Sequence, residues 1–134
     1  MKAVFDAIEA LLLPRSCYYL DATGAAKFPY VLFTLGYNTP TADGTVDGNR
    51  SDLDLAFRLT SAAWSPDGVD SVAESTKSAL GGSLPKRIAV AGFTTADVRW
   101  LRTESAGVDR DVTLTDSGTH PAYRVDSYRV VLTK

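Results

Sequence analysis

The amino-acid sequence predicts an α+β fold: a mainly antiparallel β-sheet with two α-helices packed on it, in the order α-β-β-β-α-β-β-β. Three observations lead to this prediction. Apolar side chains recur every three or four residues in two segments, which is typical of amphipathic helices. They alternate or run almost continuously in several other segments, as in strands. Glycine and proline separate these segments, and a chain of 134 residues, 45% of them hydrophobic, suits one domain over residues 1–134.

Each expected helix has a stripe of apolar residues and a defined end. The first covers residues 2–13 and ends before Pro14, because the residue before a proline disfavours the α conformation. The second follows Ser65-Pro66, an N-cap and a proline suited to the first turn, and ends at Gly81-Gly82. The expected inner stripes are Val4, Phe5, Ile8, Leu11 and Leu12, and then Val69, Val72, Ala73, Thr76, Ala79 and Leu80.

Six segments are expected to be strands: residues 17–20, 28–36, 51–64, 98–103, 108–115 and 122–133, with a turn at 116–118. Residues 28–36 are almost continuously apolar, which favours a central strand covered on both faces. Residues 51–64 alternate, which favours a strand with one exposed face. The apolar set of this strand is Leu53, Leu55, Phe57 and Leu59, and its polar set is Asp52, Asp54 and Arg58.

Composition excludes several classes of protein. The 14 Lys and Arg residues against 16 Asp and Glu give a net charge of −2, so no basic excess favours nucleic acid. The single cysteine excludes an internal disulfide framework. No apolar run approaches the ~18–20 residues of a membrane span. Asp6 and Glu9 interrupt the apolar N-terminal positions, so this segment does not resemble a signal peptide.

The sequence disfavours an enzyme. A Ser-His-Asp or Cys-His site would have to use His120, the only histidine, which follows a turn-forming segment and is expected to be exposed. Cys17 begins an expected strand and fits a small buried apolar residue. These two residues are too few for structural zinc, which needs about four Cys or His ligands. No phosphate-binding glycine motif or carboxylate couple stands out, and we expect no cofactor.

A long polar loop is expected at about residues 37–50. Loops beyond ~12–15 residues in compact domains are usually functional or disordered. Interpreted as a calcium loop, this region would offer the ligand and turn positions Asp43, Thr45, Asp47, Gly48, Ser51 and Asp54. Arg50 stands where such loops have an apolar residue, the flanking segments are not helical, and the last ligand is Asp rather than Glu. An ordinary turn-rich loop is therefore favoured over a metal site.

Arginines flank an aromatic residue in the segment that contains Arg99, Trp100 and Arg102, with Arg110 close behind. Arginine beside aromatic rings can bind single-stranded nucleic acid. The acidic residues interleaved here favour a mixed-charge sheet face instead. They are Asp97, Glu104, Asp109 and Asp111.

The order of the expected segments along nearly the whole chain is itself informative. The chain begins with a helix and a short strand, followed by Phe28-Pro29-Tyr30-Val31 leading to Gly36. A polar loop, a long alternating strand and a central helix come next, and a tyrosine-rich segment from Asp116 to Val130 closes the series. This arrangement resembles the tail-terminator (tail-completion) proteins of long-tailed bacteriophages and their minor-tail and neck relatives. That family has no catalytic residues to transfer.

The resemblance implies a structural virion protein of the tail or neck, assembled in the host bacterial cytoplasm. Its copies would form a ring, typically a hexamer, that caps the tail tube, stops its polymerisation and meets the head–tail connector. The implied partners are further copies of the chain, the tail tube protein and the connector protein. DNA would only pass through the lumen, and no membrane is involved. A head-closure or connector subunit is the nearest alternative, and a small ligand- or calcium-binding α+β module a more distant one.

Head-to-tail contacts in such a ring join two different patches of each subunit. The candidate patches are the 37–50 loop and the exposed faces of the strands at 51–63 and 122–133. The candidate interaction residues are Tyr37, Asn38, Thr39, Asp43, Asp47, Asn49, Arg50, Arg58, Arg124 and Arg129.

Overall fold

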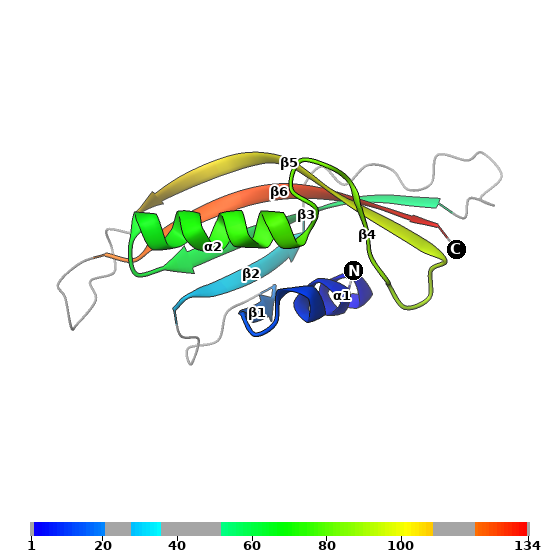
Figure 1. The fold of residues 1–134 in the computed structure, drawn as a ribbon, viewed down its shortest axis with the longest axis horizontal. Coiled ribbons are helices and arrows are strands. Elements are labelled where there is room, and N and C mark those ends of the chain that lie inside the picture. Colours follow the sequence, from blue (N-terminus) through cyan, green and yellow to red (C-terminus); the bar gives the residue numbers. More distant parts are fainter. Residues whose placement is uncertain (1, 21–27, 36–51, 109–119, 134) are drawn as a thin grey trace.

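A computed structural model of the chain describes residues 2–20, 28–35, 52–108 and 120–133. Two helices, α1 (Lys2–Leu12) and α2 (Pro66–Ala79), pack against a six-stranded sheet (Figure 1). The strands are β1 (Ser16–Tyr19), β2 (Tyr30–Leu35), β3 (Asp52–Ala63), β4 (Lys86–Arg87), β5 (Thr95–Val108) and β6 (Ala122–Thr133). Their order is β1-β2-β3-β6-β5-β4, in which β1 and β2 are parallel and every other pair is antiparallel. The α+β class is confirmed.

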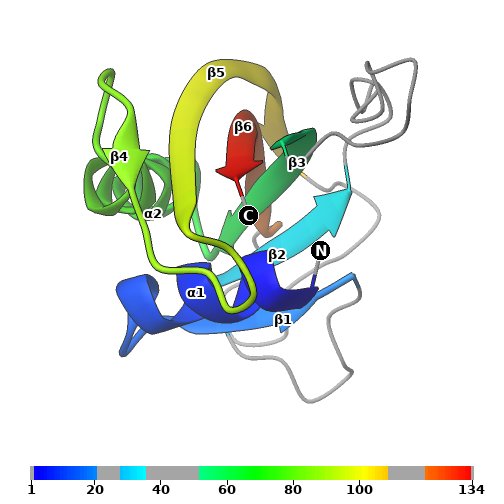
Figure 2. The ribbon, with the colours of Figure 1, turned by 90° about the vertical axis from the view of Figure 1, so that its right-hand side faces the viewer.

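Both helices lie on the same side of the curled sheet (Figure 2). We call this side the inner face and the opposite side the outer face. Residues paired across β3 and β6 point to the same face, and successive residues alternate between faces. Phe57 and Tyr128 therefore share the inner face, whereas Arg58 and Ser127 share the outer face.

The ends of α2 follow from its sequence. The Ser65 Oγ accepts a hydrogen bond from the Gly68 backbone N–H at 3.1 Å, and Pro66 occupies the first turn. Gly81 has φ of +101°, a conformation that glycine adopts without steric cost, and a Cβ there would lie 2.6 Å from the Leu84 carbonyl oxygen. The predicted start and end of this helix are confirmed.

A row of aromatic rings forms the centre of the core on the inner face. Phe5 of α1 contacts Phe33 of β2, which stacks on Phe57 of β3 with ring centroids 4.9 Å apart. Phe57 in turn stacks on Tyr128 of β6 at 5.5 Å. Three of these four side chains are at most 1% exposed and Phe5 is 4% exposed. The row therefore joins α1 to three adjacent strands through one continuous apolar contact.

Several predicted details differ from the structure. Leu11 is 39% exposed, because the buried stripe of α1 consists of Val4, Phe5, Ile8 and Leu12. β2 is covered on one face only: Val31 and Phe33 are buried, whereas Leu32 between them is half-buried. Both errors come from counting apolar residues without knowing which side of the element meets the core.

The strands after α2 also differ from the prediction. β4 has only two residues, too short to show an alternating pattern in the sequence. β5 begins at Thr95 and extends through Val108, so the predicted separate strand at 108–115 begins inside it. Residues 109–115, the turn at 116–118 and the loop at 37–50 lie outside the described residues.

The Tyr128 hydroxyl is buried and has no hydrogen-bond partner among the described residues. Burial, followed by the negative charge of Asp126, raises the pKa of Tyr128 above its ordinary value. A buried polar group without a partner costs about 1–3 kcal/mol. The ring packs in the aromatic row with or without its hydroxyl, so the unpaired hydroxyl only lowers the stability of the fold.

We predict that Tyr128→Phe raises the free energy of unfolding by about 1 kcal/mol, because it removes the unpaired hydroxyl and keeps the ring. Urea denaturation of both proteins measures this change. Tyr123→Phe, on the outer face, is the control and should stay within about 0.5 kcal/mol of wild type. A destabilised Tyr128→Phe variant would show that the hydroxyl has a partner.

Candidate interaction surface

The structure brings together no catalytic constellation among its described residues. No group of three or more His, Cys, Asp and Glu residues within them could hold a metal ion. Cys17 is half-buried against the core, and burial, with Glu9 nearby, raises the pKa of its thiol to about 11. The thiol is therefore protonated near neutral pH and a poor nucleophile. His120 is half-buried at the start of the last segment.

Within the described parts of the chain, neither α1 nor α2 is long and apolar enough to cross a bilayer.

The outer face of the sheet has no described helix packed on it, and it carries several charged side chains. Arg58 of β3 forms a two-pronged ion pair with Glu104 of β5, including a 3.4 Å contact between Nη2 and Oε1. Arg102 approaches the same carboxylate at 3.6 Å. Because β6 lies between β3 and β5, the Arg58–Glu104 pair spans three strands.

A second ion pair on this face joins the neighbouring strands β3 and β6. Arg129 of β6 donates from Nε to Asp54 Oδ1 of β3 at 2.6 Å, and its Nη2 contacts Oδ2. Arg99 of β5 stands directly opposite Arg129 in the sheet register and takes part in none of the ion pairs among the described residues. We call the outer-face set Asp54, Arg58, Arg99, Arg102, Glu104 and Arg129 the arginine patch.

Two β-bulges in β5 help to build this patch. They lie between Trp100 and Arg102 and between Thr103 and Ser105. A bulge inserts one residue and changes which face the following side chains occupy. Trp100, before the first bulge, shares the inner face with Tyr128 opposite it. After that bulge Thr103 lies on the inner face, whereas Arg102 and Glu104 reach the outer face.

The other end of the outer face has an aromatic groove. Tyr30, Ala62 and Tyr123 lie side by side on β2, β3 and β6, so a small residue stands between two tyrosines. The ring of Tyr123 covers Gly107 of β5, where a Cβ would lie 3.2 Å from the tyrosine oxygen. The groove has a volume of about 320 Å³ and is lined by Phe28, Tyr30, Thr60, Ala62, Pro121, Ala122 and Tyr123, without a charged side chain.

A larger hollow of about 550 Å³ lies between the C-terminal end of α1 and α2. Arg15 is its only charged lining residue, beside Leu11, Leu12, Leu13, Pro14, Ser16, Phe28, Pro29, Ser75, Thr76 and Ala79. No acid–base couple lines it, so neither hollow has the positioned titratable groups that an enzyme needs.

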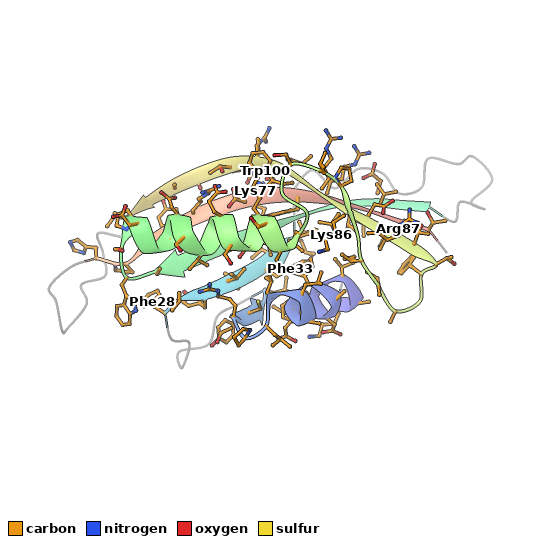
Figure 3. All side chains as sticks on the ribbon, viewed as in Figure 1. Phe28, Phe33, Lys77, Lys86, Arg87 and Trp100 are labelled. Carbon is orange, nitrogen blue, oxygen red and sulfur yellow. The ribbon has the colours of Figure 1, made fainter. Side chains whose placement is uncertain are left out.

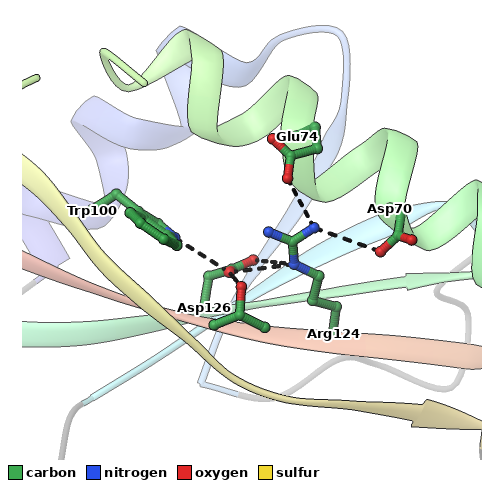
Figure 4. A network of polar contacts seen from close by, with 6 residues as sticks. Asp70, Glu74, Trp100, Arg124 and Asp126 are labelled. Carbon is green, nitrogen blue, oxygen red and sulfur yellow. Dashed lines mark hydrogen bonds and ion pairs between the residues drawn. The ribbon is translucent and has the colours of Figure 1, made fainter. Parts of the chain in front are cut away.

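Arg124 lies on the inner face of the sheet, beneath α2 (Figure 4). It was predicted as an exposed contact residue, and that prediction is wrong: only 9% of the residue is exposed. Its Nη1 lies 3.0 Å from Glu74 Oε1 and 3.5 Å from Asp70 Oδ1 of α2. Its Nε lies 3.2 Å from Asp126 Oδ2 on its own strand. The guanidinium thus joins α2 to the sheet.

Asp126 is 2% exposed and gathers polar groups from two strands. Its Oδ1 accepts a 2.6 Å hydrogen bond from the Thr103 hydroxyl and a 3.3 Å bond from Trp100 Nε1, both on β5. Coulomb attraction to Asp126 and a hydrogen bond to Glu74 outweigh burial and raise the pKa of Arg124. Removing one of these partners is costly, because a buried charge is stabilised only by the groups that it contacts.

Trp100 does not share a face with its flanking arginines. Its ring lies beneath Lys77 of α2, whose Nζ is 3.6 Å from the ring centroid (Figure 3). The interleaved arginine and aromatic surface that would stack nucleotide bases is therefore absent from the described residues. The mixed-charge interpretation of this segment agrees with the Arg58–Glu104 and Arg87–Asp97 pairs.

The remaining predicted site residues have different outcomes. Arg58 and Arg129 are on the outer face as expected, each in an ion pair. Asp54, the only calcium candidate whose side chain is described, is bound by Arg129. Tyr37, Asn38, Thr39, Asp43, Thr45, Asp47, Gly48, Asn49, Arg50 and Ser51 lie outside the described residues, as do the side chains of Asp52 and Leu53.

A scan against protein-family models and a search of curated proteins both find no match to this chain.

We predict that Arg124→Met lowers the free energy of unfolding by about 3–5 kcal/mol, because it leaves Asp126 buried without its cation. Glu74→Gln alters an exposed partner of the same guanidinium and should cost no more than about 1 kcal/mol. Chemical denaturation measures both variants. Equal effects of the two substitutions would contradict the dominant role of Asp126.

The Arg58–Glu104 pair predicts a dependence of stability on pH. Hydrogen bonds from Arg58 and then Ser127 hold the pKa of Glu104 below its ordinary value. The pair therefore stabilises the fold above the unfolded pKa of about 4.3, and this contribution is lost as the pH falls through the lower folded pKa. Glu104→Gln should be less stable than wild type at pH 7, and the difference should shrink below about pH 4. Thermal unfolding from pH 3 to 7 measures it, and a constant difference would refute the assignment.

Proposed function

We propose that this protein is a structural subunit of a bacteriophage tail, a tail terminator whose copies form a ring at the end of the tail tube. The ring stops tube polymerisation and provides the surface that meets the head–tail connector. The protein acts in the virion, after assembly in the host bacterial cytoplasm, and DNA passes through its lumen as cargo.

The observation that carries this proposal is the outer face of the sheet, which no described helix covers. It presents ion-paired arginines at one end and an aromatic groove at the other. Surfaces of this kind suit contacts with other proteins, in which arginine and aromatic residues are enriched. The order of helices and strands, α-β-β-β-α-β-β-β, also supports the resemblance to tail terminators.

The lack of a catalytic arrangement within the described residues is compatible with a role in assembly. His120 and Cys17 have no common site there: Cys17 packs against the core beside α1, while His120 precedes β6. A chain of net charge −2 also suits a lumen along which DNA slides, since added positive charge would create phosphate contacts.

Electron microscopy of negatively stained protein, with and without isolated tail tubes, tests the function. We expect rings at the ends of tubes and tubes that no longer lengthen when the protein is added. A protein that binds the isolated head connector but never a tube would instead favour the head-closure role. A protein that contacts neither would refute a place in the tail.

A further inference from the structure

The arginine patch carries more positive than negative side chains, and the further carboxylate on this face of β5, that of Asp97, is already bound by Arg87. The patch contains four guanidinium groups and two carboxylates, a net charge of +2 in a chain of net charge −2. Arg99 and Arg129 stand directly opposite each other on antiparallel strands. Like charges in that position destabilise a sheet. The patch therefore costs the isolated subunit stability that an external anionic partner would restore.

The exposed side of α2 has the opposite imbalance. Asp67, Asp70 and Glu74 are all exposed, and the last two side chains are 66% and 59% exposed. Asp70 follows Asp67 by three residues and precedes Glu74 by four, spacings at which like charges repel on a helix. Lys77, the one basic residue of α2, lies over Trp100, and the single positive charge of Arg124 is shared among Asp70, Glu74 and the buried Asp126.

From these two surfaces we propose that the chain binds a second copy of itself, with the arginine patch of one subunit against the acidic side of α2 of the next. Each surface supplies the charge that the other lacks, so the contact relieves both sets of repulsion. Exposed serines at positions 71 and 78 leave room around the carboxylates for long arginine side chains. The inference rests on the proposed function for the idea of a repeating assembly, while the charges supply the surfaces.

The two surfaces lie on opposite sides of the sheet, since α2 covers the inner face and the arginine patch lies on the outer face. A contact between two different surfaces is heterologous, so each subunit uses both and copies add head to tail. Such a series closes into a ring when each contact also includes the necessary rotation, and otherwise continues as a filament.

Charge reversal on the two surfaces tests this contact. In the first variant, Arg99→Glu and Arg102→Glu make the patch acidic. In the second, Asp67→Lys and Ser71→Lys make α2 basic, and Asp70 and Glu74 stay unchanged so that their contacts with Arg124 remain. Each variant alone should associate more than about tenfold more weakly than wild type, because like charges then meet across the contact. An equal mixture of the two should associate again, since every contact in an alternating series is complementary.

Sedimentation velocity over a range of protein and salt concentrations gives the association constants, and thermal unfolding verifies that each variant is folded. Wild-type association should weaken as salt rises from 50 to 500 mM, because these exposed charges are screened. The control is Lys2→Glu with Arg15→Glu, which changes the net charge by the same amount as the first variant but lies on the side of α1. It should associate like wild type.

Three results would overturn the proposal: a wild-type protein that stays monomeric at low salt, a first variant that associates normally, or a mixture that does not recover. Binding of duplex DNA by the patch, lost in the first variant without any self-association of wild type, would also overturn it in favour of a nucleic-acid surface. If the mixture recovers but no tail tube is capped, this contact stands and the proposed function fails. If tubes are capped by the first variant alone, the function stands and this contact fails.

Discussion

Both helices pack on one face of the sheet, and this one-sided covering decides the role of nearly every strand residue. On β3 and β6, Phe57 and Tyr128 point to the helices and belong to the aromatic row, while Arg58 and Arg129 beside them lie on the outer face. A shift of one residue in either strand would exchange the two sets. The continuous contact from Phe5 to Tyr128 fixes the register, because large rings fit only where they meet each other. The outer face is thereby free to carry charge without weakening the core.

The inner face changes character along its length. At one end it is apolar, around Val98 and Val130, and further along it meets α2 through Arg124 and Asp126. A buried ion pair contributes little net stability, yet it penalises any arrangement that separates its members. The pair therefore restricts how α2 can sit on the sheet more than it strengthens the attachment. Apolar contacts of Val69 and Val72 supply the binding of the helix itself.

Much of the fold follows from local sequence patterns. Ser65-Pro66 and Gly81 mark the limits of α2 because capping depends on adjacent residues, and alternation identifies β3 and β6 because the strands are long. Arg124 could not be placed in this way. The Arg-x-Asp spacing puts both residues on one face of a strand, but the acidic residues that reach Arg124 come from a helix 50 or more positions away. β4 is too short for any periodic signal, and the bulges of β5 change the facing of Arg102 and Glu104 in a manner that simple alternation does not anticipate.

The shortness of β4 leaves a long strand at the border of the sheet. β4 pairs with β5 at Asp97 and Val98 only, and along Arg99–Val108 no other described strand adjoins that border. Unpaired backbone of this kind invites strand addition from neighbouring molecules and disordered aggregation. The two bulges interrupt its regular spacing, and the charged side chains of Arg99, Arg102 and Glu104 follow one another along it. The same irregular, charged segment that presents the arginine patch therefore also protects the protein at the high local concentrations reached during particle assembly.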